Sequence, residues 1–222
     1  MNSAHIYKTE MHCHTMESSL RCGKVPAKEI VKVYEDAGYD TLIITDHFGG
    51  KHRTDKGAEY DLQTFLEGYR TAKANSKNLN ILLGMEINLL ENKNDYLVYG
   101  ITEEIIREFP KMYELTIGDF CDFAHEIGLT VYQAHPFRNG MSIIPPVIVD
   151  GVEGFNAHPR HDSRNSIAMA WAELYNKKTI SGSDAHQPQD LARGGIMSRL
   201  KITNNHELLT VLTNCDYSLI TL

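Results

Sequence analysis

Short apolar runs alternate with longer amphipathic segments along the chain. Seven of the short runs have the composition of buried strands: Ile6–His12, Thr41–Thr45, Ile81–Ile87, Tyr96–Tyr99, Thr130–Gln133, Gly151–Phe155 and Thr179–Ser181. Six of the longer segments carry apolar residues at helical spacing: Ala27–Ala37, Leu62–Ser76, Thr102–Glu108, Ile117–Ile127, Ser163–Asn176 and His206–Thr213. Strands that alternate with helices in this way predict parallel βαβ units.

This alternation predicts one α/β domain over residues 1–222. No internal repeat, low-complexity tract or linker-like run divides the chain. Seven strands in 222 residues suit a compact, barrel-like α/β fold that is smaller than an eight-stranded barrel. An open, doubly wound sheet is the competing architecture.

Composition narrows the classes of function. Apolar residues make up 42% of the chain and charged residues 23%, which excludes disordered, collagen-like and coiled-coil proteins. The formal net charge of -7 disfavours non-specific binding to nucleic acid or to an anionic membrane. The 11 histidines are the unusual feature, because neutral imidazole is the commonest metal ligand in proteins.

The remaining compositional signals favour a cytoplasmic protein. Its four cysteines form no CxxC pair, as is typical of reduced thiols in a reducing compartment. The first residues lack the charged and apolar regions of a secretory signal. No apolar run approaches the roughly 20 residues that span a bilayer, so we expect no membrane partner.

Potential metal ligands follow five of the predicted strands. They stand in HxH, TDH, GMEI, AHPF and GSDAH, and they are His12 and His14, Asp46 and His47, Glu86, His135, and Asp184 and His186. In α/β barrels the carboxyl ends of the strands and the loops that follow them build the active site. We therefore expect these side chains to meet at one end of the fold.

The spacing within two of these motifs supports a shared site. Residues two apart on an extended strand point to the same side, so His12 with His14, and Asp184 with His186, each present paired ligands. Cys13 points away. Buried charges cost several kcal/mol unless they are paired or bound to a metal. The set as a whole therefore predicts a metal centre.

Taken in order, these motifs resemble those of the PHP metallophosphoesterases, a family named for polymerase and histidinol phosphatase. The resemblance runs from His12 to His186 and so covers most of the chain. It implies a distorted (β/α)7 barrel that holds two or three divalent metals, usually zinc, manganese or iron, at the carboxyl ends of the strands. It also implies hydrolysis of phosphoesters through a hydroxide that bridges two metals.

The resemblance implies a coordination scheme. The first metal would take His12, His14, Glu86 and Asp184. Glu86 would bridge to a second metal, which also takes His135. The third metal would use His47, His186 and a ligand from the loop after HxH.

The chain departs from the family at two positions. In the loop that reads HCHTMESSLRCG, Glu17 is the expected replacement for the third-metal ligand, with Cys22 as the alternative. The strand after Glu86 lacks the further histidine of relatives, and its best match is Asp95. Asp95 is either a ligand or only a turn residue; if it is only a turn residue, the second site is short of ligands and is expected to be weak or empty.

Further polar residues are candidates for chemistry around the metals. Asp184 is a candidate base as well as a ligand, and Asp46 a carboxylate that orients a ligand imidazole. His158 is a candidate ligand or proton donor. Candidate phosphate-binding guanidinium groups are those of Arg138, Arg160 and Arg193. The other histidines, His5, His52, His125, His161 and His206, are expected to be structural or exposed.

The favoured substrate is a small phosphorylated metabolite or nucleotide, because the chain is acidic and has little extra length for a nucleic-acid channel. We do not expect nucleic acid as a partner. The alternatives are a histidinol-phosphatase-type enzyme, a hydrolase of C–N or C–O bonds of the amidohydrolase kind, and a non-catalytic module that binds metal or phosphate. No P-loop, GxSxG or GxGxxG motif is present.

Overall fold

Two twisted sheets form the centre of the computed structural model, which describes residues 6–54 and 56–222. The first sheet has the strand order β11-β10-β1-β2-β4. Its strands are β1 (Tyr7–Glu10), β2 (Thr41–Ile44), β4 (Asn80–Leu83), β10 (Gly194–Ser198) and β11 (Tyr217–Thr221). The second has the order β3-β5-β6-β7-β8-β9. Its strands are β3 (His47–Phe48), β5 (Met85–Asn88), β6 (Asp95–Tyr99), β7 (Thr130–Gln133), β8 (Gly151–Asn156) and β9 (Lys178–Gly182).

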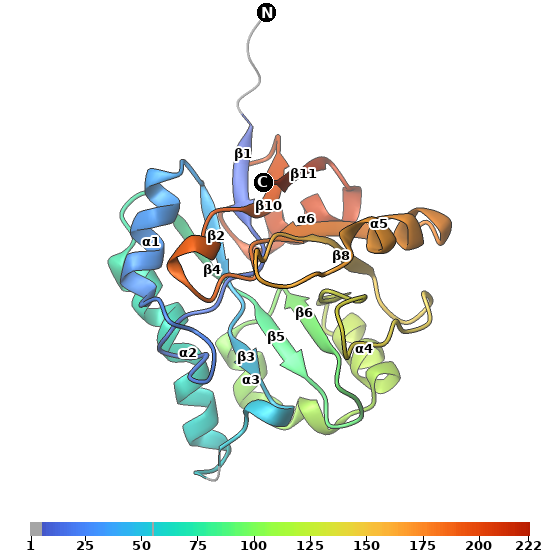
Figure 1. Ribbon diagram of the computed structural model, residues 1–222. Helices are drawn as coiled ribbons and strands as arrows, with labels where there is room; N and C mark the ends of the chain where they lie inside the picture. Colours follow the sequence, from blue (N-terminus) through green and yellow to red (C-terminus); the bar gives the residue numbers. More distant parts are fainter. Residues whose placement is uncertain (1–5, 55) are drawn as a thin grey trace, which may run out of the picture.

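All six predicted helices are present, with ends that differ by a few residues. They are α1 (Ala27–Asp36), α2 (Ala58–Asn75), α3 (Glu103–Glu108), α4 (Ile117–Glu126), α5 (Asn165–Leu174) and α6 (Asn205–Asn214). They lie around the outside of the two sheets (Figure 1). Short 3-10 turns occupy Gly50–His52, Met112–Glu114 and Pro188–Asp190. Thr102, Thr116 and Asn204 cap the N-termini of α3, α4 and α6 with their side-chain oxygens.

The fold is mixed α/β, but the implied (β/α)7 barrel is not shown. Parallel pairing joins β1 to β2, β2 to β4, β3 to β5, β7 to β8 and β8 to β9. Antiparallel pairing joins β5 to β6, β6 to β7, β1 to β10 and β10 to β11. Across the described residues the sheets are not closed into one ring. An isolated parallel bridge between Cys13 and Ala185 links them instead.

One predicted strand, Ile81–Ile87, divides into β4 and β5 at Gly84. A Cβ at this glycine would lie 2.7 Å from Ile43 Cγ2 and 2.9 Å from Thr45 Cγ2. The chain therefore crosses closely over the end of β2, where Gly84 N–H donates to the Ile44 carbonyl at 2.9 Å. This crossing carries the polypeptide from the first sheet into the second and delivers Glu86 to the second.

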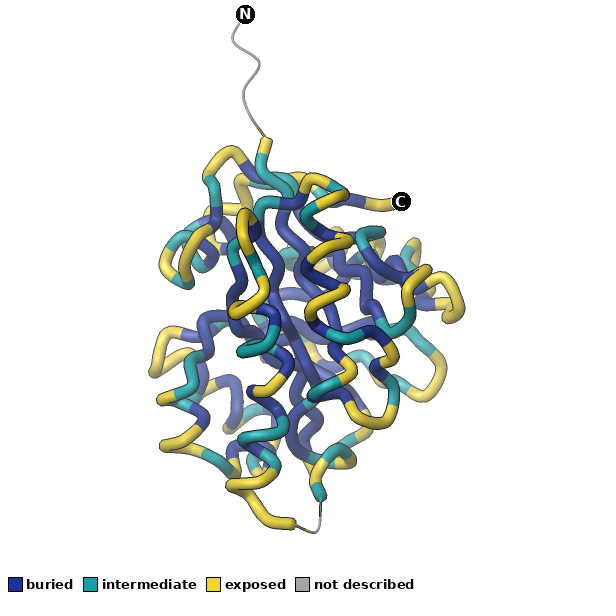
Figure 2. The backbone as a smooth tube through the Cα atoms, turned by 90° about the vertical axis from the view of Figure 1, so that its left-hand side faces the viewer, coloured by how far each residue is buried: buried dark blue, intermediate teal, exposed yellow. Residues whose placement is uncertain are grey.

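The core lies between the sheets and the surrounding helices. Figure 2 shows buried backbone running through the middle of the molecule, with exposed backbone on the outer helices and loops. The largest fully buried side chains include Tyr34, Tyr96, Tyr99, Tyr132 and Phe120. Within the described residues, the helices are all too short or too polar to cross a bilayer.

Candidate metal centre

The two paired-ligand segments lie side by side where the sheets meet. The His12 carbonyl accepts from Asp184 N–H at 2.8 Å, and the Ala185 carbonyl accepts from His14 N–H at 3.1 Å. Cys13 and Ala185 face the same apolar cluster on the other side of this pairing. His12, His14 and Asp184 therefore face the opposite way, as their spacing predicts.

Two of the residues that form the centre have left-handed backbone conformations. His135 has φ of 30° and Asp184 has φ of 48°. Such conformations are uncommon for residues other than glycine and cost about 1–3 kcal/mol each, which is why they concentrate at functional sites. Each residue lies two positions after the end of a strand, β7 or β9, and its side chain faces the other residues of the centre.

Glu86 lies in the middle of the converging histidines. Its Oε1 is 3.4 Å from His12 Nε2 and 3.2 Å from His135 Nε2. Its Oε2 is 3.3 Å from His14 Nε2 and 2.7 Å from His47 Nδ1. One carboxylate thus faces four imidazoles from different segments of the chain, which is the arrangement expected of a bridging ligand.

Asp184 divides its two oxygens between different partners. Oδ1 faces the imidazoles of His12, His14 and His186 at 3.5, 3.4 and 3.5 Å. Oδ2 accepts from Arg138 Nη2 at 2.7 Å and from Asn156 Nδ2 at 3.1 Å. These two donors hold the carboxylate so that Oδ1 stays directed at the histidines.

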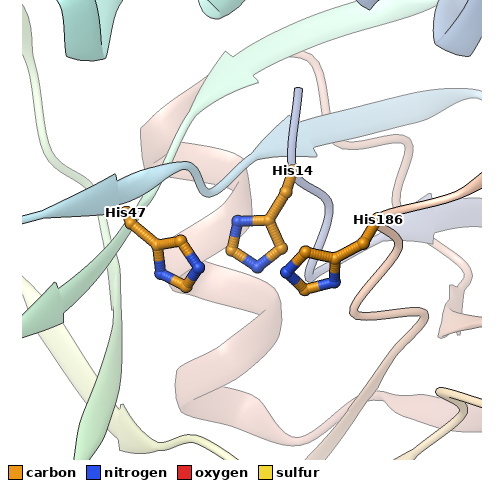
Figure 3. A group of neighbouring side chains, drawn as sticks. All are labelled: His14, His47 and His186. Atoms are coloured by element: carbon orange, nitrogen blue, oxygen red, sulfur yellow. The ribbon is translucent and has the colours of Figure 1, made fainter. Parts of the chain in front are cut away.

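Four overlapping groups of side chains have the geometry of metal sites, each with its ligand atoms within 4.8 Å of one another. They are His12, His14 and Glu86; Glu86, Asp95 and His135; His14, His47 and His186; and His158, His186 and Asp190. Figure 3 shows the third group, whose rings approach one another from three separate segments. The His14 ring stacks between those of His47 and His186, with centroids 4.3 and 4.4 Å away.

The donor set fits divalent metal ions. Glu86 Oε2 and His47 Nδ1 are buried and lie 2.7 Å apart, but neither atom forms a hydrogen bond, and a buried polar atom without a hydrogen bond is costly. Nitrogen and carboxylate oxygen are the atoms with which zinc, iron and manganese are bound in proteins. A metal ion between these atoms would satisfy them.

The pKa of one histidine in the centre is raised and the pKa of another is lowered. Burial lowers the pKa of His12, but the charges of Glu153, Asp184 and Glu86 outweigh it and raise the pKa well above its ordinary value. The pKa of His14 is well below its ordinary value because burial and the neighbouring His47 and His186 act together. The ring of His14 is therefore neutral, which is the form that ligates a metal.

The comparisons with known proteins agree with this geometry. None of the curated protein sequences matches the chain, but the model of the PHP domain matches residues 10–212. The chain belongs to the PHP domain family. This membership confirms the resemblance drawn from the ordered motifs between His12 and His186.

Solved structures with the same fold include both small and large proteins. PsfC from Pseudomonas syringae superposes with a TM-score of 0.73 at 18% identity, covering 98% of this chain and 92% of that one. A two-domain protein from Bacteroides vulgatus, which contains a predicted PHP-like metal-dependent phosphoesterase, has a TM-score of 0.67 at 16% identity. The match covers 98% of this chain and 65% of that protein.

A third neighbour acts on nucleic acid. The lesion-specific endonuclease PfuEndoQ from Pyrococcus furiosus has a TM-score of 0.64 at 15% identity, and the match covers 97% of this chain and 58% of that enzyme. Endonuclease Q has also been solved with a 27-mer duplex that carries an abasic lesion at the active site. The fold of this chain is thus shared with a lesion-specific endonuclease.

A buried carboxylate that the sequence analysis did not select supports the PHP centre from behind. Glu153 Oε1 lies 2.9 Å from His12 Nδ1, and Oε2 accepts from His135 N–H at 3.0 Å and from Asn156 Nδ2 at 2.9 Å. It therefore orients one ligand imidazole and anchors the backbone of another. The sequence feature that could have identified Glu153 is a charged residue inside the otherwise apolar strand β8.

The carboxylate of Asp46 reaches a histidine through another side chain, that of Ser19. Its carboxylate accepts from Thr15 N–H, Thr15 Oγ1 and Ser19 Oγ, each at 2.7 Å. Ser19 Oγ in turn lies 3.2 Å from His14 Nδ1. Burial raises the pKa of Asp46 to about 6. Its direct partners are thus in the loop after HxH, and it reaches an imidazole only through Ser19.

The two candidates in that loop have different surroundings. Both carboxylate oxygens of Glu17 accept from Ala27 N–H, at 3.1 and 3.0 Å, and Glu17 is in none of the four groups. The thiol of Cys22 donates to the Ser19 carbonyl at 3.8 Å, and Cys22 is likewise in none of the four groups. Burial raises the pKa of that thiol, but the imidazoles of His186 and His47 outweigh burial and lower the pKa to about 6.

Asp95 lies in the second group with Glu86 and His135, at the start of β6. Its carboxylate also accepts from Lys51 Nζ, at 3.1 Å to each oxygen, and from Asn88 Nδ2 at 3.1 Å. Lys51 is half exposed. A cation therefore already faces the carboxylate of Asp95.

The three candidate phosphate-binding arginines differ in position. Arg138 lies in the centre, where its Nη2 contacts Asp184, Asn156 and Ser163. Arg160 forms an ion pair with the buried Asp190, with Nη2 2.9 Å from Oδ2. Arg193 Nη2 donates to the Leu222 carbonyl at 3.4 Å. Arg138 is thus against Asp184, whereas the guanidinium of Arg160 contacts His158 and Asp190 of the fourth group.

His158 lies beside the centre, buried, with its ring 5.7 Å from that of His186. Burial lowers its pKa to about 4. Two histidines that we expected to be structural or exposed lie close by. The His52 ring stacks on that of His47 with centroids 3.9 Å apart, and the His161 ring packs on that of His158 with centroids 4.4 Å apart. His5 lies outside the described residues.

Proposed function

We propose that this PHP-family protein is a phosphatase or phosphodiesterase that hydrolyses a small phosphorylated metabolite or nucleotide. Membership of the family and the PHP-like phosphoesterase neighbours support metal-dependent hydrolase activity. The observation that carries the finer proposal is the guanidinium of Arg138 beside Glu86-centred metal ligands. A fixed positive charge next to metals is what a phosphoryl group requires.

The clustered histidines and carboxylates would hold two or three divalent ions, for which zinc, manganese and iron are the candidates. The first would be held by His12, His14, Glu86 and Asp184, and the second by Glu86, His135 and Asp95. The third would involve His47 and His186. When bound, such ions supply positive charge that acidifies a coordinated water and stabilises negative charge on phosphoryl oxygens.

Arg138 has the role of orienting the substrate. Its Nη2 is held by Asn156 Oδ1 at 2.9 Å and by Ser163 Oγ at 3.1 Å, so its direction is set before the substrate binds. A guanidinium held in this way presents its remaining N–H groups to phosphoryl oxygens without losing further side-chain entropy. Asp184 stays our candidate for the base, and His158 for the leaving-group donor.

The Endonuclease Q neighbours change one expectation. They act on DNA, so the expectation that nucleic acid is not a substrate is not supported. The acidic net charge of -7 still favours a small substrate for this chain. DNA that carries an abasic lesion is therefore included as a second substrate class in the test.

The test is phosphate-ester hydrolysis by metal-stripped protein reloaded separately with zinc, manganese or ferrous iron. An aryl monophosphate, a bis-aryl phosphodiester and an abasic duplex are offered in parallel, with His14→Ala as the control. Metal-dependent turnover that the variant lacks is the expected result. Equal rates in the variant, or no turnover on any substrate by folded, metal-loaded protein, would contradict the proposal and favour a C–N hydrolase or a binding module.

A further inference from the structure

The ligands of the second metal position include a carboxylate that a lysine already holds. Asp95 is buried, and each of its carboxylate oxygens lies 3.1 Å from the ammonium of Lys51. Oδ1 also accepts from Asn88 Nδ2 at 3.1 Å. Both oxygens of the carboxylate that groups with Glu86 and His135 are therefore engaged by hydrogen-bond donors.

The carboxylate at the first metal position is arranged differently. Arg138 and Asn156 donate to Oδ2 of Asp184, and Oδ1 stays directed at the histidines. Asp184 is thus able to take a metal at Oδ1 and keep its guanidinium partner at Oδ2. Both oxygens of Asp95 face the same ammonium, and an ammonium and a divalent ion on one carboxylate repel each other.

The chain around Lys51 is built to deliver its ammonium to Asp95. Asn88 Oδ1 accepts from Lys51 N–H at 3.2 Å, while Nδ2 of the same amide donates to Asp95. Gly50 has a φ of 39°, and a Cβ there would lie 2.1 Å from Asn88 Oδ1. Only glycine lets the 3-10 turn that carries Lys51 press against Asn88 in this way. One amide therefore fixes both partners of the ion pair.

The ammonium is able to leave, but the carboxylate is not. The side chain of Lys51 is 48% exposed and that of Asp95 only 5%. A lysine released from Asp95 passes directly into water, whereas a buried carboxylate without a cation carries a large desolvation cost. Exchange of the ammonium for a metal ion leaves Asp95 paired in both states.

We propose that the Lys51 ammonium and the second metal are exclusive occupants of Asp95, so that the second position binds its ion more weakly than the first and fills after it. Glu86 belongs to both positions, whereas Asp95 belongs to the second alone. The competition therefore acts on one position of the centre. This proposal rests on the proposed metal-loaded centre, but not on its substrate.

The first test measures the affinity of the second ion. Zinc is titrated by calorimetry into metal-free wild type and into Lys51→Met, which keeps an unbranched side chain without its charge. We expect the Kd of the second zinc ion to fall by about fivefold in Lys51→Met, because no ion pair with Asp95 then has to be broken. Lys51→Arg, which keeps the charge, should behave like the wild type. Lys93→Met, at an exposed lysine that lines the same surface pocket as Lys51, is the matched control and should do the same.

A double-mutant cycle assigns the change to Asp95. Asp95→Asn removes the anionic ligand, so binding of the second zinc ion should weaken, and adding Lys51→Met should then have no effect. An effect of Lys51→Met that persists beside Asp95→Asn would place the action of the lysine elsewhere and overturn the proposal. Unchanged zinc binding in Asp95→Asn would overturn it as well.

The second test follows the amine itself. Metal-free and zinc-loaded protein are treated briefly with acetic anhydride, and each lysine is followed by peptide mass spectrometry. We expect zinc to increase the acetylation rate of Lys51 by about fivefold, because breaking the same ion pair releases the amine. Lys93 should react equally in both samples. Equal acetylation of Lys51 with and without zinc would contradict the proposed exchange.

These measurements are independent of turnover. Circular dichroism establishes that each variant is folded. Because the readouts are bound zinc and the reactivity of one amine, they decide the competition for Asp95 even when no phosphoester is hydrolysed. Absent turnover in protein that shows the expected exchange would reject the proposed activity and leave the competition supported.

Discussion

At the scale of single residues, the centre depends on carboxylates whose charge is balanced by the histidines around them. Burial raises the pKa of Glu86, but the charges of His47 and His12 outweigh burial and hold that pKa well below its ordinary value. Glu86 and Asp184 are thus anionic in a buried site. Without such partners, each charge would carry a desolvation cost of several kcal/mol.

The Glu153→Gln variant tests whether Glu153 positions the candidate ligands His12 and His135. The amide keeps the volume of the side chain but cannot accept at both ends, so His12 Nδ1 or His135 N–H loses its partner. We expect metal affinity to fall by about 10–100-fold. Competition with a chelating dye measures this, and Glu173→Gln, an exposed site on α5, is the matched control. Unchanged affinity in the Glu153 variant would argue against a positioning role.

At the scale of elements, apolar periodicity predicted the helices well but missed part of the sheets. The strands β10 and β11 were not predicted, because GGIMS and YSLIT lack a regular apolar pattern with recognisable turns. They exist because β10 pairs with β1 over Tyr7–Thr9 and supports β11 in turn. Strand β3 has only two residues, too few for any periodicity to register.

A contact between α2 and α3 provides a pH-dependent test of how the helices are held. Arg70 Nε donates to Glu103 Oε1 at 3.1 Å, and this hydrogen bonding lowers the pKa of Glu103 below 4.5. The stabilisation is therefore present above pH 4.5 and is lost as the pH falls through the pKa of the folded protein. Glu103→Gln should lower the free energy of unfolding by about 0.5 kcal/mol at pH 7.

Urea unfolding at pH 7 and pH 4 measures this difference. The difference between the wild type and the Glu103 variant should shrink at pH 4, because more of the wild-type carboxylate is then protonated. Glu108→Gln, at the exposed end of the same helix, is expected to leave the free energy of unfolding unchanged at both values. A difference that grows at the lower pH would contradict the assigned sign.

At the scale of the whole molecule, the candidate metal centre lies where the two sheets meet. The bridge between Cys13 and Ala185 joins the segment after β1, the central strand of the first sheet, to the segment after β9, an edge strand of the second. Ligands come from both sides of this junction, with Asp184 and His186 after β9 and His12 and His14 after β1. Bound metal should therefore hold the sheets together as well as supply chemistry.

Removing metal should lower the stability of the protein. A ligand present at 100 times its Kd stabilises the folded state by about 2.7 kcal/mol, which for a chain of this size corresponds to a Tm shift of about 5–11 °C. We expect chelation of metal-loaded protein to lower Tm by this amount, as measured by calorimetry. Glu86→Gln should show a much smaller shift. An unchanged Tm in protein proved to lose its metal would reject the junction role.

The sequence by itself determined the family of this protein and indicated residues that gather around Glu86, because residue types and strand-end spacing are local properties. The tertiary structure alone decided the two-sheet arrangement, the selection of Glu153, and the contrast between Glu17 and Cys22. These depend on which segments pack together across the chain. Glu17 and Cys22 are five positions apart in one loop, and only the structure shows Glu17 at the start of α1 and the Cys22 thiol against the Ser19 carbonyl.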